Sequence, residues 1–568
     1  MFVPRQMKIL RLPGPSLKPP RISGSALAAM RRLAETPGAD VALRALLKTT
    51  LGIDRLAELP ERFRGPLPMH TRPLQARPAN ARPSAGLPRP AQAEWPRTIH
   101  SFASAYRDGN ISPRDVATRA LAQLDELGAR RPSMNILAAK DPTMTLRDAD
   151  ASAERFARGC PIGPLDGVPF LVKDQCDVDG LSTRDGSICE SDAPAACDST
   201  VVARLRKAGA VFSGKTVLTT WGMSPIGNSA DYDMPHNVHD TSRAAGGSST
   251  GSAVGVALGM APMAIGTDGG GSIRIPASLN GIFGIKPTFG RVPRSPTSSS
   301  SVGHIGPIAS STWDLAAFLD VVASEPGPRD PMTSWAPAPP DGGFGVHLGS
   351  GVRGLRIGID ELEMRQAEPD IVRAFERVIA RLEQEGARIV RIEIPMAKYA
   401  PAMGYMTISP EVVAVKRDIL RNRRSELPDD IRLMFAIVEG FSCGEYLDAQ
   451  RLRSGLRMAV AELFRDIDVI ALPTTAMTAP RYTEAEERMP FSDPTAIDAL
   501  CRFNFLGNLT GLPAATAPIG VDSKGLPIGL QVVGDAWDEA TVLSVLAHLE
   551  RIGVATVKKP PGAVDLLA

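Results

Sequence analysis

The chain has 568 residues, of which 43% are apolar and 22% charged, a composition ordinary for a globular protein long enough to bury a large core. Its formal net charge of +2 gives no whole-chain reason to expect binding to nucleic acid or to a membrane. The six cysteines are sparse and show no Cys-x-x-Cys and no Cys/His zinc spacing. We therefore expect a reduced, cytoplasmic protein with no metal and no cofactor.

The basic residues are concentrated at the N-terminus. Through Glu94 there are 16 Lys and Arg against 6 Asp and Glu, and the remainder has 48 against 56. Residues 1–25 contain five prolines and no apolar stretch of signal-peptide type, so we expect no secretory signal. The most apolar segment, 254–265, is too short to span a bilayer.

Residues 1–62 are predicted to form a basic, helical N-terminal extension. Helices are expected at 25–33 and, after a Pro-Gly break, at 41–59. Two short helices cannot bury their own apolar face, so they should dock on the body or on a second subunit. Residues 63–96 are rich in proline and arginine and are predicted to be a linker or arm. Because this arm can either wrap its own subunit or cross a boundary, a homodimer through the N-terminal region is one of two expectations.

Residues 97–556 are predicted to be the catalytic domain, followed by a C-terminal tail at 557–568. Short apolar strands alternate with helices in this region, which predicts an α/β fold with one large sheet. The expected strands are 168–172, 211–213, 355–359, 390–394 and 469–473, and the expected helices are 112–127, 199–208, 252–259, 369–386 and 540–549.

Three glycine-containing motifs carry the candidate chemistry. Lys173 ends the apolar segment 168–173, Ser248 follows two glycines, and Ser272 follows three. Backbone N–H groups in a glycine-rich loop can point at one oxygen atom, as acyl-transfer enzymes require where negative charge develops. A lysine in an apolar segment is the residue type whose pKa falls when it is desolvated.

These motifs resemble the amidase signature family of serine hydrolases. The 75 positions from Lys173 to Ser248 and the 24 from Ser248 to Ser272 match the spacing of that family's Ser–cis-Ser–Lys triad. The similarity extends over about residues 97–555. The resemblance implies one large mixed β-sheet flanked by helices and the hydrolysis of a small-molecule carboxylic amide, with esters and carbamates as further substrates of the same machinery.

The resemblance also assigns roles to individual residues. Ser272 would be the nucleophile, and Lys173 would deprotonate Ser248, which deprotonates Ser272 across a cis bond between Gly247 and Ser248. Lys173 has to be neutral for this, so burial must lower its pKa by roughly 3 units from about 10.4. The expected oxyanion hole consists of Gly269, Gly270, Gly271 and Ser272, and the expected loop supports are Ser249, Asp268 and Arg274.

Two other motifs fit the sequence literally. Residues 247–251 read G-x-S-x-G, the nucleophile elbow of an α/β-hydrolase esterase that would use Ser249. The segment before it, 239–245, is polar and loop-like where an elbow needs a strand. Residues 209–216 read G-x-x-x-x-G-K-T, a phosphate-binding loop, but the middle residues form an apolar strand pattern.

A further alternative belongs to the same family. Some members serve as the glutaminase subunit of a tRNA-dependent amidotransferase. A long N-terminal extension is not typical of that subunit, and residues 416–420, followed by Arg421, match its substrate-binding segment only in part. Thr250 stands where the family commonly has glycine. Pocket residues are expected from 223–234, 405–411 and 477–503, whose Met, Phe and Tyr favour acyl chains or aryl groups.

Overall fold

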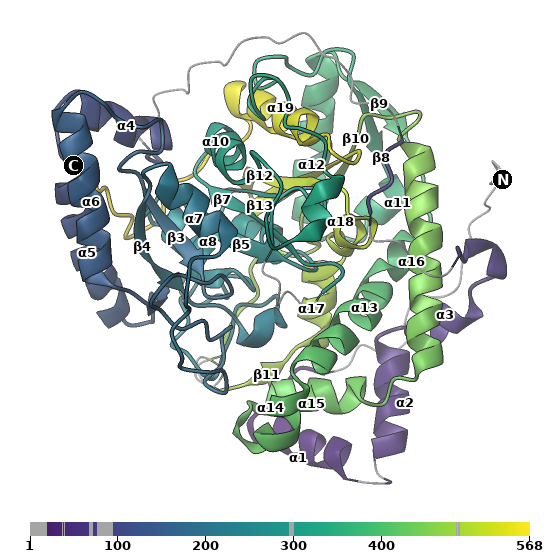
Figure 1. The fold of residues 1–568 in the computed structure, drawn as a ribbon. Coiled ribbons are helices and arrows are strands. Elements are labelled where there is room, and N and C mark those ends of the chain that lie inside the picture. Colours follow the sequence, from purple (N-terminus) through teal and green to yellow (C-terminus); the bar gives the residue numbers. More distant parts are fainter. Residues whose placement is uncertain are drawn as a thin grey trace.

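The computed structural model describes residues 20–36, 38, 40–66, 72–76, 95–294, 300–483, 486 and 489–568. Within these residues, one mixed sheet of eleven strands crosses the molecule in the order β2-β4-β3-β5-β7-β6-β12-β13-β10-β8-β9 (Figure 1). The strands are β2 Leu137–Ala139, β3 Pro169–Lys173, β4 Val211–Thr216, β5 Met263–Asp268, β6 Phe283–Lys286, β7 His304–Ala309, β8 Arg356–Ile359, β9 Arg388–Arg391, β10 Val469–Pro473, β12 Ala514–Val521 and β13 Pro527–Gly534.

Helices flank this sheet, which confirms the predicted α/β class with one large mixed sheet. The helices are α1 Gly24–Glu35, α2 Asp40–Thr50, α3 Asp54–Glu58, α4 Ile99–Arg107, α5 Pro113–Ala129, α6 Pro142–Ala157, α7 Thr200–Lys207, α8 Thr250–Ala257, α9 Arg274–Leu279, α10 Thr312–Val322, α11 Glu361–Met364, α12 Pro369–Gln384, α13 Ala400–Val415, α14 Arg417–Asn422, α15 Asp429–Val438, α16 Cys443–Leu463, α17 Pro494–Cys501, α18 Phe505–Thr510 and α19 Glu539–Arg551.

Three neighbouring strands toward the β2 end of the sheet, β4, β3 and β5, run parallel. β3 pairs in parallel with β4 on one side and with β5 on the other. All five residues of β3 are buried, as expected for a strand covered on both faces. Because parallel neighbours end at the same edge, the last residues of β3 and β5 lie together at one edge of the sheet.

Local sequence explains where several elements begin and end. Ser112 caps α5 by accepting a hydrogen bond from the backbone N–H of Asp115, and Pro113 occupies the first turn. The predicted strand 469–473 is confirmed as β10. The predicted strand 390–394 is wrong in position, since β9 ends at Arg391. The single helix predicted at 41–59 is also wrong, because Gly52 adopts a φ of 69° and separates α2 from α3.

The helical extension packs on α15 and α16 of its own chain (Figure 1). Leu27 is fully buried in a cluster with Leu433, Ala436 and Ile437 of α15. The Glu35 carboxylate accepts hydrogen bonds from arginines that include Arg432. A short two-stranded sheet, β1 Ile22–Ser23 with β11 Phe491–Ser492, also joins the extension to the body.

The described parts of the arm also lie on their own subunit. The N–H of Gly65 donates to the carbonyl of Arg451 on α16 at 2.8 Å. Farther along, the N–H of Ala76 donates to the carboxylate of Asp535 at 3.0 Å. Residues 67–71 and 77–94 of the arm lie outside the described part of the chain. These contacts agree with wrapping of one subunit, and the homodimer stays a prediction.

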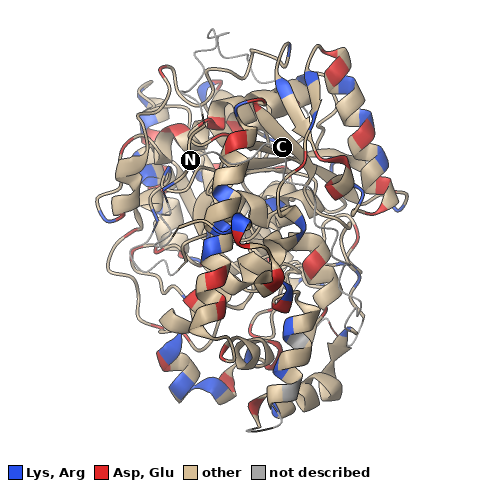
Figure 2. Ribbon diagram, turned by 90° about the vertical axis from the view of Figure 1, so that its right-hand side faces the viewer, with Lys and Arg blue, Asp and Glu red and all other residues tan. Residues whose placement is uncertain are grey.

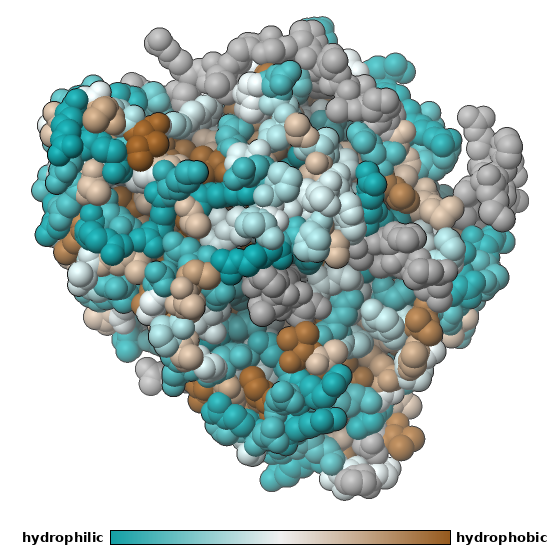
Figure 3. Space-filling model, viewed as in Figure 1, coloured by the Kyte–Doolittle hydropathy of each residue, from teal (hydrophilic) through white to brown (hydrophobic). Residues whose placement is uncertain are grey.

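The surface carries no single dominant sign of charge. Basic and acidic residues are interspersed along the outer helices (Figure 2). On the face seen in Figure 3, apolar side chains form small, scattered patches. No helix among the described residues is long and apolar enough to cross a membrane.

The docking of the extension gives a stability prediction. Leu27→Ala should lower the free energy that holds α1 on the body by about 2–4 kcal/mol, because a fully buried side chain is lost from the contact with α15. Hydrogen exchange of α1 measures this directly. The matched control is Leu33→Ala on the same helix, where the side chain is 48% exposed, and its effect should stay within about 0.5 kcal/mol. Equal effects of the two variants would contradict the docking.

Candidate active site

Lys173 lies at the end of β3 and is fully buried. Its Nζ lies within hydrogen-bond distance of Ser248 Oγ, at 2.7 Å, and of Thr267 Oγ1, at 2.6 Å. Burial lowers the pKa of Lys173 to about 7, while the carboxylates of Asp185 and Asp268 act in the opposite direction. The amine can therefore lose its proton near neutral pH, as a base in this position must.

The loop before α8 carries Ser248 and Ser249. The peptide bond between Gly247 and Ser248 is cis, as the family resemblance implies. Ser249 is fully buried and donates from its backbone N–H to the carbonyl of Ser272 at 3.2 Å. Its hydroxyl donates to the carbonyl of Thr267 and accepts from the same residue's N–H. Ser249 thus joins this loop to β5 and to the loop of Ser272.

Ser272 is half-buried at the end of the glycine loop that follows β5. Asp268 organises this loop: its carboxylate accepts from the N–H of Gly271 at 2.8 Å and from both Nε and Nη2 of Arg274 at 2.9 Å. The Gly271 N–H is consequently turned inward. Among the described residues, no group accepts from the N–H of Gly269, of Gly270 or of Ser272.

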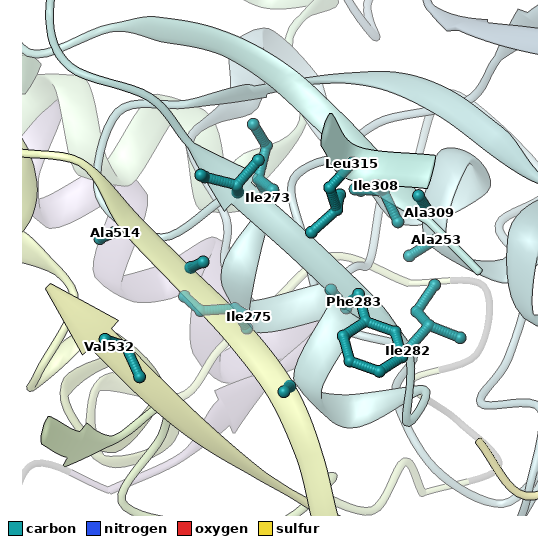
Figure 4. Packing of buried hydrophobic residues seen from close by; sticks show 14 of the residues in the cluster. Ala253, Ile273, Ile275, Ile282, Phe283, Ile308, Ala309, Leu315, Ala514 and Val532 are labelled. Carbon is teal, nitrogen blue, oxygen red and sulfur yellow. The ribbon is translucent and has the colours of Figure 1, made fainter. Parts of the chain in front are cut away.

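The residue after Ser272 anchors the loop. A Cβ placed at Gly266, Gly284 or Gly306 would lie 2.9, 2.9 or 3.2 Å from the side chain of Ile273. Glycines on three adjacent strands therefore leave the space that Ile273 fills, among the other buried residues of the core (Figure 4). This close packing fixes where Ser272 stands.

Apolar side chains adjoin the glycine loop. A Cβ at Gly269 or Gly270 would meet Ile408 or Phe505, respectively, at 2.7 Å. Tyr405, one turn before Ile408 on α13, packs edge-on against Phe505 with ring centroids 5.1 Å apart. Of the expected pocket segments, 405–411 lies beside the loop, and Phe505 stands just beyond the segment 477–503.

The two literal motifs do not have the context they need. No strand precedes Ser249 in the described segment 239–245. An elbow serine also needs a histidine later in the chain, but His548 lies on α19, where its Nδ1 accepts from Arg551. Lys215 of the phosphate-loop pattern is buried within β4 and ion-paired with Asp174 at 2.6 Å. Neither an esterase elbow nor a phosphate site is present at these positions.

Sequence reasoning missed several residues around the site. Thr267 and Gln175 form a hydrogen-bonded pair behind Lys173. Asn508 donates to both the carbonyl and the carboxylate of Asp268. A polar residue two positions after the strand end was the only signal for Gln175, and nothing in the spacing pointed to Thr267.

Comparison with known proteins identifies the family of this chain. A family model described as Amidase matches residues 120–543. The fatty acid amide hydrolase of Arabidopsis thaliana is 36% identical over 83% of this chain and 78% of its own length. The fatty acid amide hydrolase of Oryza sativa subsp. indica is 32% identical over 99% of this chain and 97% of its own length. One chain of the glutamyl-tRNA(Gln) amidotransferase of Chloroflexus aggregans is 32% identical over 82% and 98%.

Solved structures show the same fold. A protein from a vestigial complex that bears on the origins of an s-triazine catabolic enzyme superposes with a TM-score of 0.73 at 31% identity, covering 81% of this chain and all of its own. A bacterial aryl acylamidase of the amidase signature family superposes with a TM-score of 0.72 at 25% identity, covering 80% of this chain and 96% of its own. Fold and relatives thus define an amide-hydrolysing enzyme. The chain belongs to the amidase signature family.

Burial of the lysine predicts a dependence of stability on pH. Lys173 keeps its proton up to about pH 10.4 in the unfolded chain but only to about pH 7 in the fold. The unfolded chain binds more protons between these values, so folding stability should rise with pH across this window. Lys173→Met removes the free-energy cost of burying an amine that must give up its proton. The variant should therefore be more stable by about 2–4 kcal/mol at pH 7, and this gain should vanish toward pH 10.

Chemical denaturation at several pH values measures this gain. Lys215→Met is the matched control, because this lysine is equally buried but paired with Asp174. Its removal leaves a buried carboxylate without its partner and should destabilise the fold. A Lys173→Met protein that is less stable at pH 7, or a gain independent of pH, would contradict the desolvation of Lys173.

Proposed function

We propose that the enzyme hydrolyses fatty acid amides through an acyl-enzyme on Ser272, with Ser248 and Lys173 as its proton relay. The observation that carries this proposal is the fully buried Lys173 amine 2.7 Å from Ser248 Oγ. A neutral amine in that position is a base, and a serine nucleophile requires one.

The proton moves in both directions during the reaction. Lys173 takes the proton of Ser248, which takes that of Ser272 as Oγ attacks the carbonyl carbon. When the tetrahedral intermediate collapses, the same relay returns the proton to the leaving nitrogen. Water then attacks the acyl-enzyme by the reverse path and releases the fatty acid.

The backbone of the glycine loop stabilises the developing oxyanion. Gly269, Gly270 and Ser272 supply the donors, because the Gly271 N–H is held by Asp268. Asp268 and Arg274 keep the loop in shape through their buried ion pair. Ser249 supports the neighbouring loop.

Two observations favour a fatty acyl group over glutamine. The side chains beside the glycine loop are apolar, with Ile408 and Phe505 closest to it. The rice fatty acid amide hydrolase matches 99% of this chain, including the N-terminal extension. The amidotransferase chain matches 82%, which leaves a share comparable to the extension unmatched.

The six cysteines are all free. This state suits a reducing compartment, and we place the enzyme in the cytoplasm.

Replacing the nucleophile tests the proposal. Ser272→Ala should lose at least about 10³-fold in kcat/KM on a fatty acyl para-nitroanilide, and it should no longer be labelled by a fluorophosphonate. Ser249→Ala, the serine of the rejected elbow, should retain labelling. Retained labelling in Ser272→Ala, or hydrolysis of glutamine but of no fatty amide by the purified chain, would overturn the proposal.

The apolar wall predicts chain-length selectivity. Ile408→Asp should lower kcat/KM for a long-chain acyl anilide by roughly 10- to 100-fold and that for the acetyl anilide much less, because a long chain loses more apolar contact with this wall than an acetyl group does. Val415→Asp is the control, since Val415 is 51% exposed on the same helix. An equal loss on both substrates would place the acyl chain elsewhere.

A further inference from the structure

Behind Lys173 runs a chain of polar side chains that leads toward the surface. Thr267 Oγ1 lies 2.6 Å from Lys173 Nζ and donates to Gln175 Oε1 at 2.5 Å. Gln175 Nε2 donates to Asp185 Oδ1 at 2.5 Å. The other oxygen of Asp185 lies 3.0 Å from Nζ of Lys416. None of the roles assigned so far uses Gln175, Asp185 or Lys416.

The chemistry of its outer end fixes the direction of this chain. A lysine ammonium only donates, and an ionised carboxylate only accepts. Asp185, paired with Lys416, must therefore face the amide nitrogen of Gln175. The amide oxygen of Gln175 is then turned to Thr267, and the single hydroxyl proton of Thr267 goes to that oxygen.

This direction decides what Lys173 meets. Thr267 offers it only acceptors, namely Oγ1 at 2.6 Å and the main-chain oxygen at 3.5 Å. A neutral amine has two N–H bonds and one lone pair. When both N–H bonds are directed to Thr267, the lone pair faces Ser248 Oγ at 2.7 Å.

We infer that Asp185 and Gln175 are positioning residues that set the hydrogen-bond direction at Thr267 and so aim the lone pair of Lys173 at Ser248. The inference rests on the proposed function of Lys173 and Ser248. If the direction of these hydrogen bonds were reversed, Thr267 would donate its hydroxyl proton to the lone pair of Lys173. The amine would then present an N–H bond to Ser248.

The charges around the two ends are few. Asp185 and Asp268 are the carboxylates that raise the pKa of Lys173 against its burial, and burial keeps the nearby Cys176 thiol uncharged by raising its pKa to about 12. Lys416 faces Asp185 and is shared with Glu190 at 2.5 Å.

Asp174 also interacts with Asp185 electrostatically, but it is ion-paired with Lys215. Because the Asp185 carboxylate raises the pKa of Lys173, removing its charge lowers that pKa further.

Asp185→Asn is a suitable probe because the backbone holds this residue independently of its carboxylate. Its N–H donates to the carbonyl of Asp174 at 3.0 Å, and its carbonyl accepts from the N–H of Trp221 at 2.8 Å. Its φ is 49°, a left-handed conformation that asparagine adopts as readily as aspartate. The asparagine can donate to Gln175, which permits the reversed direction.

The experiment measures kcat/KM against pH for the full-length chain with a fatty acyl para-nitroanilide. In Asp185→Asn the plateau at high pH should fall about tenfold or more, the equivalent of one lost hydrogen bond of about 1.4 kcal/mol. The acid limb should also move to lower pH. Gln175→Leu, which keeps the Asp185 charge, should lower the plateau similarly with a smaller displacement of the acid limb.

Glu190→Gln is the matched control. Glu190 binds the same Lys416 and accepts from Trp221 Nε1, yet it is not part of the row of hydrogen bonds from Asp185 to Lys173. Its plateau and acid limb should stay within about twofold of the wild type. An effect equal to that of Asp185→Asn would show that the ion pair acts only through the fold and would overturn the inference, as would plateaus within twofold for both Asp185→Asn and Gln175→Leu.

Two further variants separate this inference from the proposed function. Ser272→Ala and Lys173→Met are assayed alongside, and if both are inactive while Asp185→Asn and Gln175→Leu behave as wild type, only the positioning role fails. If Lys173→Met remains active, the proposed relay itself fails. Circular dichroism and thermal melting check each fold, and Gln175→Leu decides the matter if Asp185→Asn does not fold.

Discussion

The burial of one amine is the constraint on which the site depends. Lys173 ends a strand whose residues are all covered, so water cannot solvate its charge. The surrounding hydrogen bonds do not offset this cost fully, and the pKa of Lys173 falls to about 7 through burial. A lysine in solution would be charged at that pH and could not accept a proton. The sheet therefore leaves this amine able to accept a proton near neutral pH by excluding water from it.

The topology of the sheet brings the other groups to this amine. β3 and β5 are parallel neighbours, so Lys173 and the loop after Asp268 leave the sheet at the same edge. α8 begins at Thr250, directly after Ser248 and Ser249. The loop that carries these two serines contacts Lys173 through Ser248 and the loop of Ser272 through Ser249. Three segments far apart in sequence thus meet without any long reach, as is general at the carboxyl ends of strands in α/β sheets.

The sequence allowed the fold class and the family to be predicted, and it made Lys173, Ser248 and Ser272 candidate site residues because each lies in a glycine-marked motif whose spacing resembles that of the family. It did not reveal the inward turn of Gly271, since that depends on where the carboxylate of Asp268 points. Nor did it show that Ile273 fills the space over glycines of three strands, which requires knowing the strand order. Contacts made across the sheet have no local signal in the chain.

A buried carboxylate close to Lys173 would be expected to raise the pKa of its amine and keep it protonated. Asp268 is fully buried on the neighbouring strand and does act on Lys173 in that direction. Burial alone would raise the pKa of Asp268 itself, but Arg274 holds it well below its ordinary value. The guanidinium binds both carboxylate oxygens at 2.9 Å, and this pairing offsets much of the charge that Lys173 meets. The ion pair therefore does two things at once: it shapes the loop of Ser272, and it limits the effect of the Asp268 charge on the pKa of the desolvated lysine.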